Sequence, residues 1–206
     1  QHWEVLQDSI SKRWFPFAKG GDYSKYYYDL DLVVDWENDG YAIRNFVDEN
    51  GKVASRPQNL DYYFREGLTY PRSTVKGFNV RYLPTGAIFE EVGPAIFPNN
   101  ADEIWALLSI LNSRVIQAFL DMVVSRNFEV GLLVNLPIVP LLPKTKSNLG
   151  KLSWTNYRIK GKWDTGNEIC TRFTEPWLVQ IARHVEGSEI ISSKEEKTWV
   201  AQVLAL

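Results

Sequence analysis

Cations and hydroxyl-bearing rings gather around a glycine pair near the start of the chain. Lys19, Gly20 and Gly21 are followed by Tyr23, Lys25 and three further tyrosines. Glycines let backbone N–H groups approach an anion, and lysines neutralise its charge. This spacing is typical of a loop that holds a phosphate. The alternative is that the rings are core, since a chain with eight Trp and ten Phe buries most of its aromatic side chains.

A second candidate loop lies between Tyr70 and Lys76 and carries Arg72 and Ser73. Hydroxyl and basic side chains on one loop suit contacts with phosphates and base edges. Arginine makes the two-pronged contact with guanine, which discriminates by roughly 1–3 kcal/mol. The surrounding segment from Arg65 to Arg81 has four basic residues and one acid, so its net charge is +3.

The overall charge argues against a nucleic-acid partner. The 206-residue chain has a net charge of −2, whereas non-specific affinity for nucleic acid comes from basic side chains. The distribution matters more than the sum. Between Lys144 and Arg172, seven basic residues face two acids, a net charge of +5. On charge alone, nucleic-acid contact and ordinary solvated loops are equally good interpretations.

Signatures of catalysis are missing from the sequence. It has neither a phosphate-binding glycine loop nor a nucleophile elbow. Cys170, His2 and His184 are too few and too scattered for a zinc site, and one cysteine fits a reducing cytoplasm. Adenine methylation uses an Asn/Asp-Pro-Pro-aromatic loop that holds a flipped base. Asn135–Ile138 lacks the paired prolines and the ring, so we predict neither a catalytic residue nor a metal site.

Short strands and one strong helical pattern must position these loops. We expect strands at Leu32–Trp36, Gly67–Tyr70, Phe78–Leu83, Ala87–Glu90 and Leu132–Leu136. Glu37–Gly40 is a turn, with Gly40 at positive φ, and Tyr41–Phe46 is either a returning strand or a short helix.

The clearest helix follows Pro98, capped by Asn99 or Asn100. Its apolar face is predicted to contain Ile104, Leu107, Leu108, Leu111, Val115, Phe119 and Met122. Asn112 and Ser113 interrupt this face and favour a pair of helices, the second capped by Ser113.

The character of the chain changes after Pro143. Lys144–Lys162 is basic and polar, typical of a linker or surface arm, and Thr174 with Pro176 starts a helix. Ser193–Glu196 is a capping box for a last helix. We therefore predict an α+β fold with an irregular, mainly antiparallel sheet, one long helix or helix pair, and a helical C-terminal appendage. The expected divisions are a core over 1–143, a basic arm over 144–172 and a helical segment over 173–206.

The ends of the sequence suggest an excised piece of a longer polypeptide. The chain starts at Gln1 without a targeting leader and stops within the apolar stretch Trp199–Leu206. Its apolar runs are too short to span a bilayer. We expect a cytoplasmic location and no membrane partner.

The order of motifs resembles the target recognition region of BREX-type (PglX) adenine-specific DNA methyltransferases. The Leu107–Ser113 helix is also similar to one in Type II restriction-modification enzymes and Type I specificity subunits. The resemblance covers roughly residues 14–178 and departs from the family pattern at Gly166–Thr171. Its other motifs are Lys19–Tyr28, Val33–Gly40, Tyr62–Tyr70, Arg81–Phe89, Asn127–Gly131, Asn135–Ile138 and Lys162–Glu168 with Phe173.

The resemblance implies a reader of DNA sequence without its catalyst. An N-terminal methyltransferase domain of the same polypeptide would bind S-adenosylmethionine and methylate adenine N6 in restriction-modification or phage defence. This chain would bind double-stranded DNA and be inactive alone. The candidate DNA contacts are Lys19, Gly20, Gly21, Lys25, Arg44, Arg65, Tyr70, Arg72, Ser73, Lys76, Arg81 and Lys160.

Two alternatives from other classes remain open. The Trp and Tyr content with an acidic net charge also fits a carbohydrate-binding module, which exposed coplanar rings would support. An interaction domain that docks Trp199–Leu206 onto a partner helix is the other.

Overall fold

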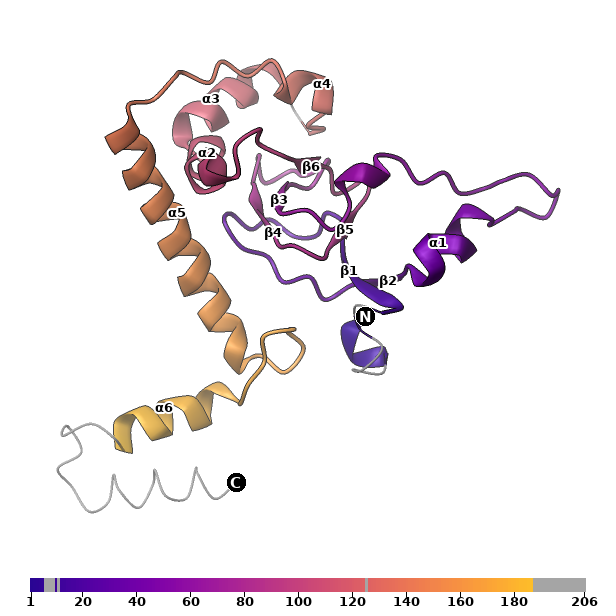
Figure 1. Ribbon diagram of the computed structural model, residues 1–206. Helices are drawn as coiled ribbons and strands as arrows, with labels where there is room; N and C mark the ends of the chain where they lie inside the picture. The colour runs from indigo at the N-terminus through magenta and orange to yellow at the C-terminus, as the bar shows by residue number, and fades with distance from the viewer. Residues whose placement is uncertain (6–9, 11, 125, 187–206) are drawn as a thin grey trace.

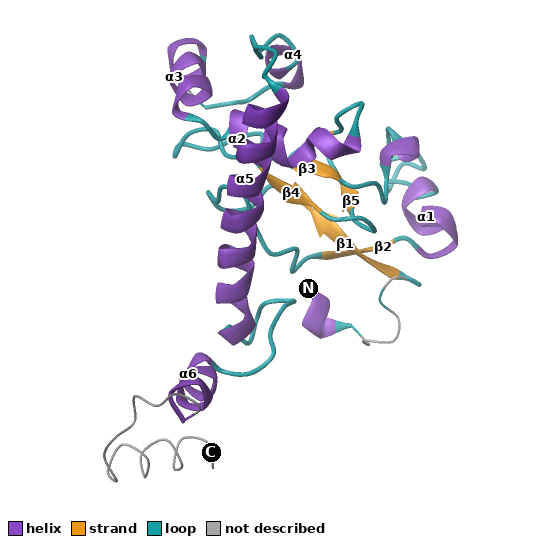
Figure 2. Cartoon of the chain, turned by 60° about the vertical axis from the view of Figure 1, so that its left-hand side comes forward, coloured by secondary structure: helices purple, strands orange, loops and turns teal. Residues whose placement is uncertain are grey.

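The computed structural model describes residues 1–5, 10, 12–124 and 126–186. Two small three-stranded sheets form its centre, with helices around them (Figures 1 and 2). Three of the four strand pairs are antiparallel, so the predicted α+β class with a mainly antiparallel sheet is confirmed. The strands are β1 (Trp14–Ala18), β2 (Val33–Asp35), β3 (Gly67–Thr69), β4 (Arg81–Leu83), β5 (Ile88–Phe89) and β6 (Ala95–Ile96).

The first sheet has the order β2-β1-β5 and the second has the order β4-β3-β6. In the second sheet, Leu68 on the central strand β3 pairs with Tyr82 on one side and Ile96 on the other. All three β3 residues are buried. The predicted strand at Gly67–Tyr70 is therefore the centre of its sheet.

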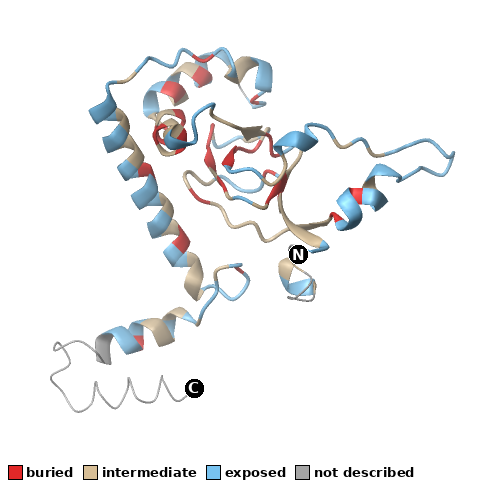
Figure 3. Ribbon diagram, viewed as in Figure 1, coloured by how far each residue is buried: buried red, intermediate tan, exposed pale blue. Residues whose placement is uncertain are grey.

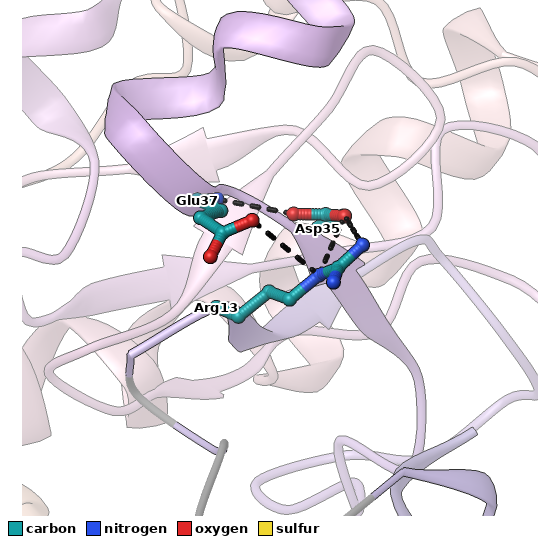
Figure 4. Close-up of polar contacts among 3 residues, drawn as sticks. All are labelled: Arg13, Asp35 and Glu37. Carbon is teal, nitrogen blue, oxygen red and sulfur yellow. Dashed lines mark hydrogen bonds and ion pairs between the residues drawn. The ribbon is translucent and has the colours of Figure 1, made fainter.

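Arg13 fastens the start of β1 to the end of β2 (Figure 4). Its Nη2 lies 2.8 Å from Asp35 Oδ2, and its Nε lies 3.8 Å from Glu37 Oε2. The hydrogen bond with Asp35 is the main reason that the pKa of Arg13 is raised. Because the side chain is exposed, water screens these ion pairs and they stabilise the fold little.

The segment after β2 combines the predicted turn with a helix. In α1 (Glu37–Arg44), Asn38, Asp39 and Gly40 have positive φ, with Gly40 at 71°. The expectation of a positive φ at Gly40 is thus confirmed, and the following residues to Arg44 are helical. The short 3-10 helices elsewhere are η1 (His2–Glu4), η3 (Leu60–Tyr62), η4 (Ala101–Glu103) and η5 (Asp164–Gly166).

The helix pair after Pro98 is confirmed with both of its caps. Asn100 accepts a hydrogen bond from the Asp102 N–H and starts η4, which leads into α2 (Ile104–Leu111). Ser113 accepts one from the Ile116 N–H and starts α3 (Arg114–Val123). The two helical stretches are bent by 64° at the break.

The predicted apolar face is right in α2 and only partly right in α3, where Phe119 packs against the core. Ile104, Leu108 and Leu111 are buried, but Val115 and Met122 are 77% and 76% exposed. The buried residues of α3 are Ile116 and Leu120. The prediction treated α2 and α3 as one continuous helix, and the bend between them turns a different face of α3 toward the core.

The main core lies between the second sheet and the α2–α3 pair. It contains Leu68, Tyr70, Phe78, Val80, Ile104, Leu108, Leu111, Ile116, Leu120, Phe128 and Leu136. Asn112 ties the helix break to this core: its side-chain amide donates to Val80 O and Leu108 O, and its Oδ1 accepts from the Val80 N–H.

Two predictions for the second half are corrected. The expected strand at Leu132–Leu136 is replaced by the short helix α4 (Val130–Leu133). The segment Lys144–Lys162, expected to be a linker or surface arm, lies in the 21-residue helix α5 (Pro143–Trp163), which the sequence analysis did not predict. The next helix, α6 (Trp177–Glu186), begins directly after Pro176, so Thr174 lies outside its first turn.

Ser193–Glu196 and Trp199–Leu206 lie outside the described residues. Within the part of the chain that is described, no single helix is long and apolar enough to cross a membrane, although α2 and α3 together meet the length and composition criteria as a bent pair.

Candidate nucleic-acid interface

Arg81 ties β4 to the first of the two loops that the sequence singles out. Its guanidinium extends from β4 to the carbonyls of Gly20 and Asp22, with a distance of 2.8 Å to Asp22 O. It also lies 4.3 Å from the centre of the Tyr28 ring. The neighbouring backbone pairs too, since the Tyr26 N–H donates to Val80 O at 2.8 Å. The segment 20–28 therefore lies beside residues 79–81.

The interior position of Arg81 determines what it can do. The residue is 1% exposed, and burial lowers its pKa to about 10, so it stays charged at neutral pH. Having so little free surface, Arg81 positions the loops and does not face solvent. Among the other candidates, Tyr70 is 1% exposed and Gly20 is also buried.

Packing explains the glycine pair without an anion. Gly20 has φ of 79° and Gly21 has φ of 90°, a region that favours glycine. A Cβ on Gly20 would lie 3.0 Å from Val92 O, and one on Gly21 would lie 2.6 Å from the Tyr28 hydroxyl. The two glycines are thus required by the turn and its neighbours.

Lys25 and Lys160 meet beside this turn. Lys25 Nζ donates to Asn112 O at 3.0 Å, at the end of α2. Lys160 Nζ, from α5, donates to Lys25 O at 3.0 Å and to the Ser24 hydroxyl. Both ammonium groups are therefore half-buried and held by oxygen atoms of the protein.

Like charges surround these two lysines. Burial and then Arg114 lower the pKa of Lys25. Burial and then Arg81 lower the pKa of Lys160, whereas Asp164 raises it. We call Lys25, Arg81, Arg114 and Lys160 the cation cluster. Arg114 was missed by the sequence analysis, although its place directly after the Ser113 cap puts it at the exposed start of α3.

Arg72 is engaged by the protein. Its Nε and Nη2 donate to Glu129 at 3.2 and 3.0 Å, and its Nη1 donates to Glu91. The pKa of Arg72 is raised, chiefly by the hydrogen bond with Glu129. The Arg72 guanidinium, which was expected to contact guanine, therefore links its own loop to the segments that carry Glu91 and Glu129.

The other candidate residues are spread over the surface. Arg44 pairs with Asp39 at 2.7 Å, and Arg65 lies over the Tyr62 and Phe97 rings. Lys19, Gly21, Ser73 and Lys76 are exposed. The structure thus brings Lys25, Arg81 and Lys160 together with Gly20, and leaves Arg44 and Arg65 apart on their own partners.

The helix α5 adds a basic surface that the candidate residues included only through Lys160. It packs against α2, where Ser153 donates to Trp105 O and Ser109 donates to Leu149 O at 2.7 Å. In its 21 residues α5 has six lysines and arginines and no Asp or Glu. Figure 3 shows the helix exposed along much of its length.

In the described part of the chain, no group of three or more His, Cys, Asp and Glu residues is arranged to hold a metal ion. The Cys170 thiol is buried, and burial raises its pKa to about 12, so it stays protonated at neutral pH. The site is therefore one of cations, hydroxyls and loops, which can hold anions.

Two adenine-specific methyltransferases are similar to the chain. PglX of Lacticaseibacillus casei (strain Zhang) is 30% identical over 184 residues, which is 83% of this chain and 15% of the relative. BrxX of Escherichia coli O9:H4 (strain HS) is 30% identical over 161 residues, 73% of this chain and 13% of the relative. No family model matches the chain.

These comparisons show which proteins the chain is related to and how much of their length it matches. The chain is homologous to part of the adenine-specific methyltransferases PglX and BrxX. It spans 15% or less of the length of these curated relatives.

Proposed function

We propose that the chain is the double-stranded DNA recognition part of an adenine-N6 DNA methyltransferase that acts in phage defence or restriction-modification. The names of the two relatives support the methyltransferase relationship. The cation cluster supports the DNA-binding role. Methyl transfer and the binding of S-adenosylmethionine belong, in this proposal, to an N-terminal methyltransferase domain of the same cytoplasmic polypeptide, and a membrane has no role.

The observation that carries the proposal is the presence of several like charges close together in the cation cluster. Lys25, Arg114 and Lys160 form no ion pair with a carboxylate within the described residues. Burial is the main cause of the lowered pKa of Lys25 and of Lys160, and repulsion from Arg114 and from Arg81, respectively, lowers these pKa values further. A phosphate beside the cluster relieves that repulsion, so the cluster favours a polyanion.

Duplex binding measured across salt tests this proposal. A labelled 30-base-pair duplex is titrated with the chain by fluorescence anisotropy between 50 and 200 mM KCl. We expect affinity to fall linearly on logarithmic axes, with a slope of about −0.9 for each phosphate neutralised. No detectable affinity at 50 mM, or affinity independent of salt, would overturn the proposal.

Arg114 gives the sharpest single-residue version of the test. It is exposed and has no carboxylate partner among the described residues, so its neutralisation leaves the packing intact. We expect Arg114→Gln to make the slope shallower by about 0.9. Lys52→Gln is the charge-matched control, because Lys52 is exposed on the segment 45–59 that extends away from α3 (Figure 1). Equal slopes for the two variants would remove the cluster from the interface.

A further inference from the structure

One face of α5 carries a continuous polar and basic stripe. Its members are spaced three or four residues apart, which places them within about 80° of arc on a helix of 3.6 residues per turn. All six are exposed. They are Lys144, Asn148, Lys151, Thr155, Arg158 and Lys162, and we call them the α5 stripe.

Packing on the opposite face fixes the direction of the stripe. Ser153 lies about 180° around the helix from Lys144; it is fully buried and hydrogen-bonds to Trp105 O. A Cβ on Gly150 would lie 3.6 Å from Trp105 Cβ, so α5 and α2 approach closely there. Lys146, on the same inner side, pairs with Glu103 at 2.6 Å. The stripe is therefore held outward by contacts that involve none of its members.

The cations of the stripe are not balanced by acidic side chains on the same helix. Surface helices ordinarily mix the two signs of charge, and like charges one turn apart, such as Arg158 and Lys162, destabilise a helix. The four cations of the α5 stripe form no ion pair with a carboxylate in the described residues, whereas Lys146 does. A run of cations without balancing carboxylates indicates a polyanionic partner.

We propose that the α5 stripe lies along the sugar–phosphate backbone of a DNA duplex, an inference that rests on the proposed function. The distance from Lys144 to Lys162 along the axis is about 27 Å at 1.5 Å per residue, the length of about eight base pairs. Lys160 belongs to the same helix but lies about 160° around it from Lys144, on the inner side where it donates to Lys25 O, so the stripe and the cation cluster occupy different faces of α5.

The flank of the helix distinguishes backbone contact from insertion into a groove. Leu152, Ile159 and Trp163 form an apolar row beside the stripe and are 58%, 64% and 69% exposed. A helix inside the major groove has phosphate strands along both flanks, and an apolar flank is unsuited to that position. The stripe therefore contacts one backbone and contributes affinity without sequence preference.

Two triple variants of equal charge test the inference. The first, Lys151→Gln with Arg158→Gln and Lys162→Gln, neutralises the stripe. The second, Lys12→Gln with Lys52→Gln and Arg56→Gln, neutralises three exposed cations elsewhere. We expect the first variant to make the salt slope shallower by up to about 2.7, at roughly 0.9 per contact, and the second to match the unaltered chain. Circular dichroism and thermal unfolding check that both variants are folded.

A footprint on the unaltered chain gives an independent readout. Acetylation of lysines, quantified by mass spectrometry with and without duplex, should show protection of Lys144, Lys151 and Lys162 but not of Lys52. Equal slopes for the two triple variants, or an unprotected stripe in a chain that binds duplex, overturn the inference and leave the proposed function standing. Absence of duplex binding by the unaltered chain overturns both.

Discussion

Replacement of Arg81 by methionine separates a positioning role from DNA contact. Arg81 makes two charge-assisted hydrogen bonds, to the carbonyls of Gly20 and Asp22, each worth about 1.5–3 kcal/mol. Methionine removes both hydrogen bonds but keeps an apolar side chain of similar length. Burial of this side chain in a site that is 1% exposed offsets about 1–2 kcal/mol of the loss. We therefore expect Arg81→Met to lower the free energy of unfolding by about 2–4 kcal/mol.

Urea unfolding followed by tryptophan fluorescence measures this loss, with Arg65→Met as the control. Arg65 is exposed and rests on the Tyr62 and Phe97 rings, so its replacement should change stability by less than about 1 kcal/mol. At temperatures where Arg81→Met stays folded, its salt slope for duplex should equal that of the unaltered chain. A variant of undiminished stability with a slope shallower by about 0.9 would identify Arg81 as a phosphate contact and refute the positioning role.

Three further predictions concern the interior. Asn112→Ala leaves the buried Val80 N–H without a partner, whereas Val80 O keeps its hydrogen bond from the Tyr26 N–H. We expect a loss of about 1–3 kcal/mol in urea unfolding; an unchanged free energy of unfolding would contradict the tie between the helix break and the core. Burial raises the pKa of Tyr70 to about 12, so the unfolded state loses the hydroxyl proton at a lower pH than the folded state. The free energy of unfolding should therefore fall as the pH rises from about 10 to 12. Tyr70→Phe should lessen that fall, and an unchanged pH profile in this variant would contradict the prediction. Ser153→Leu overfills the contact between α5 and α2, which should lower the urea midpoint by an amount corresponding to about 1–3 kcal/mol; an unaffected midpoint would mean that this contact is loose.

Local signals in the sequence predicted those parts of the fold that depend on neighbouring residues. The caps at Asn100 and Ser113 follow from side-chain acceptors placed before apolar helical runs. The positive φ of Gly40 follows from turn chemistry, and the strand at Gly67–Tyr70 from its β-type residues and flanking turns. These features need no knowledge of distant segments.

Features that depend on distant segments were misread. The helix α5 contains Thr, Ser, Asn, Gly and aromatic residues that favour helix weakly, and its stability comes from packing on α2, which no local pattern reveals. Likewise the face of α3 is set by the 64° bend. Arg81 was placed on the surface because arginine is rarely buried, and only the partner carbonyls of segment 20–22 explain its position.

Some basic residues are bonded within the protein and others are exposed, and this difference bears on how the proposed DNA recognition domain selects a site. Arg72 and Arg81 are committed to protein oxygens, so they stiffen the loops and leave contact to exposed neighbours such as Lys19, Ser73 and Lys76. In the proposed complex, the α5 stripe contacts the sugar–phosphate backbone and contributes the same affinity to every sequence. On the proposed function, exchanges within the loops change which DNA is chosen, whereas changes in the stripe weaken all duplexes alike. On this proposal, specificity also depends on Arg72 and Arg81, which do not contact the DNA themselves but determine where the exposed side chains point.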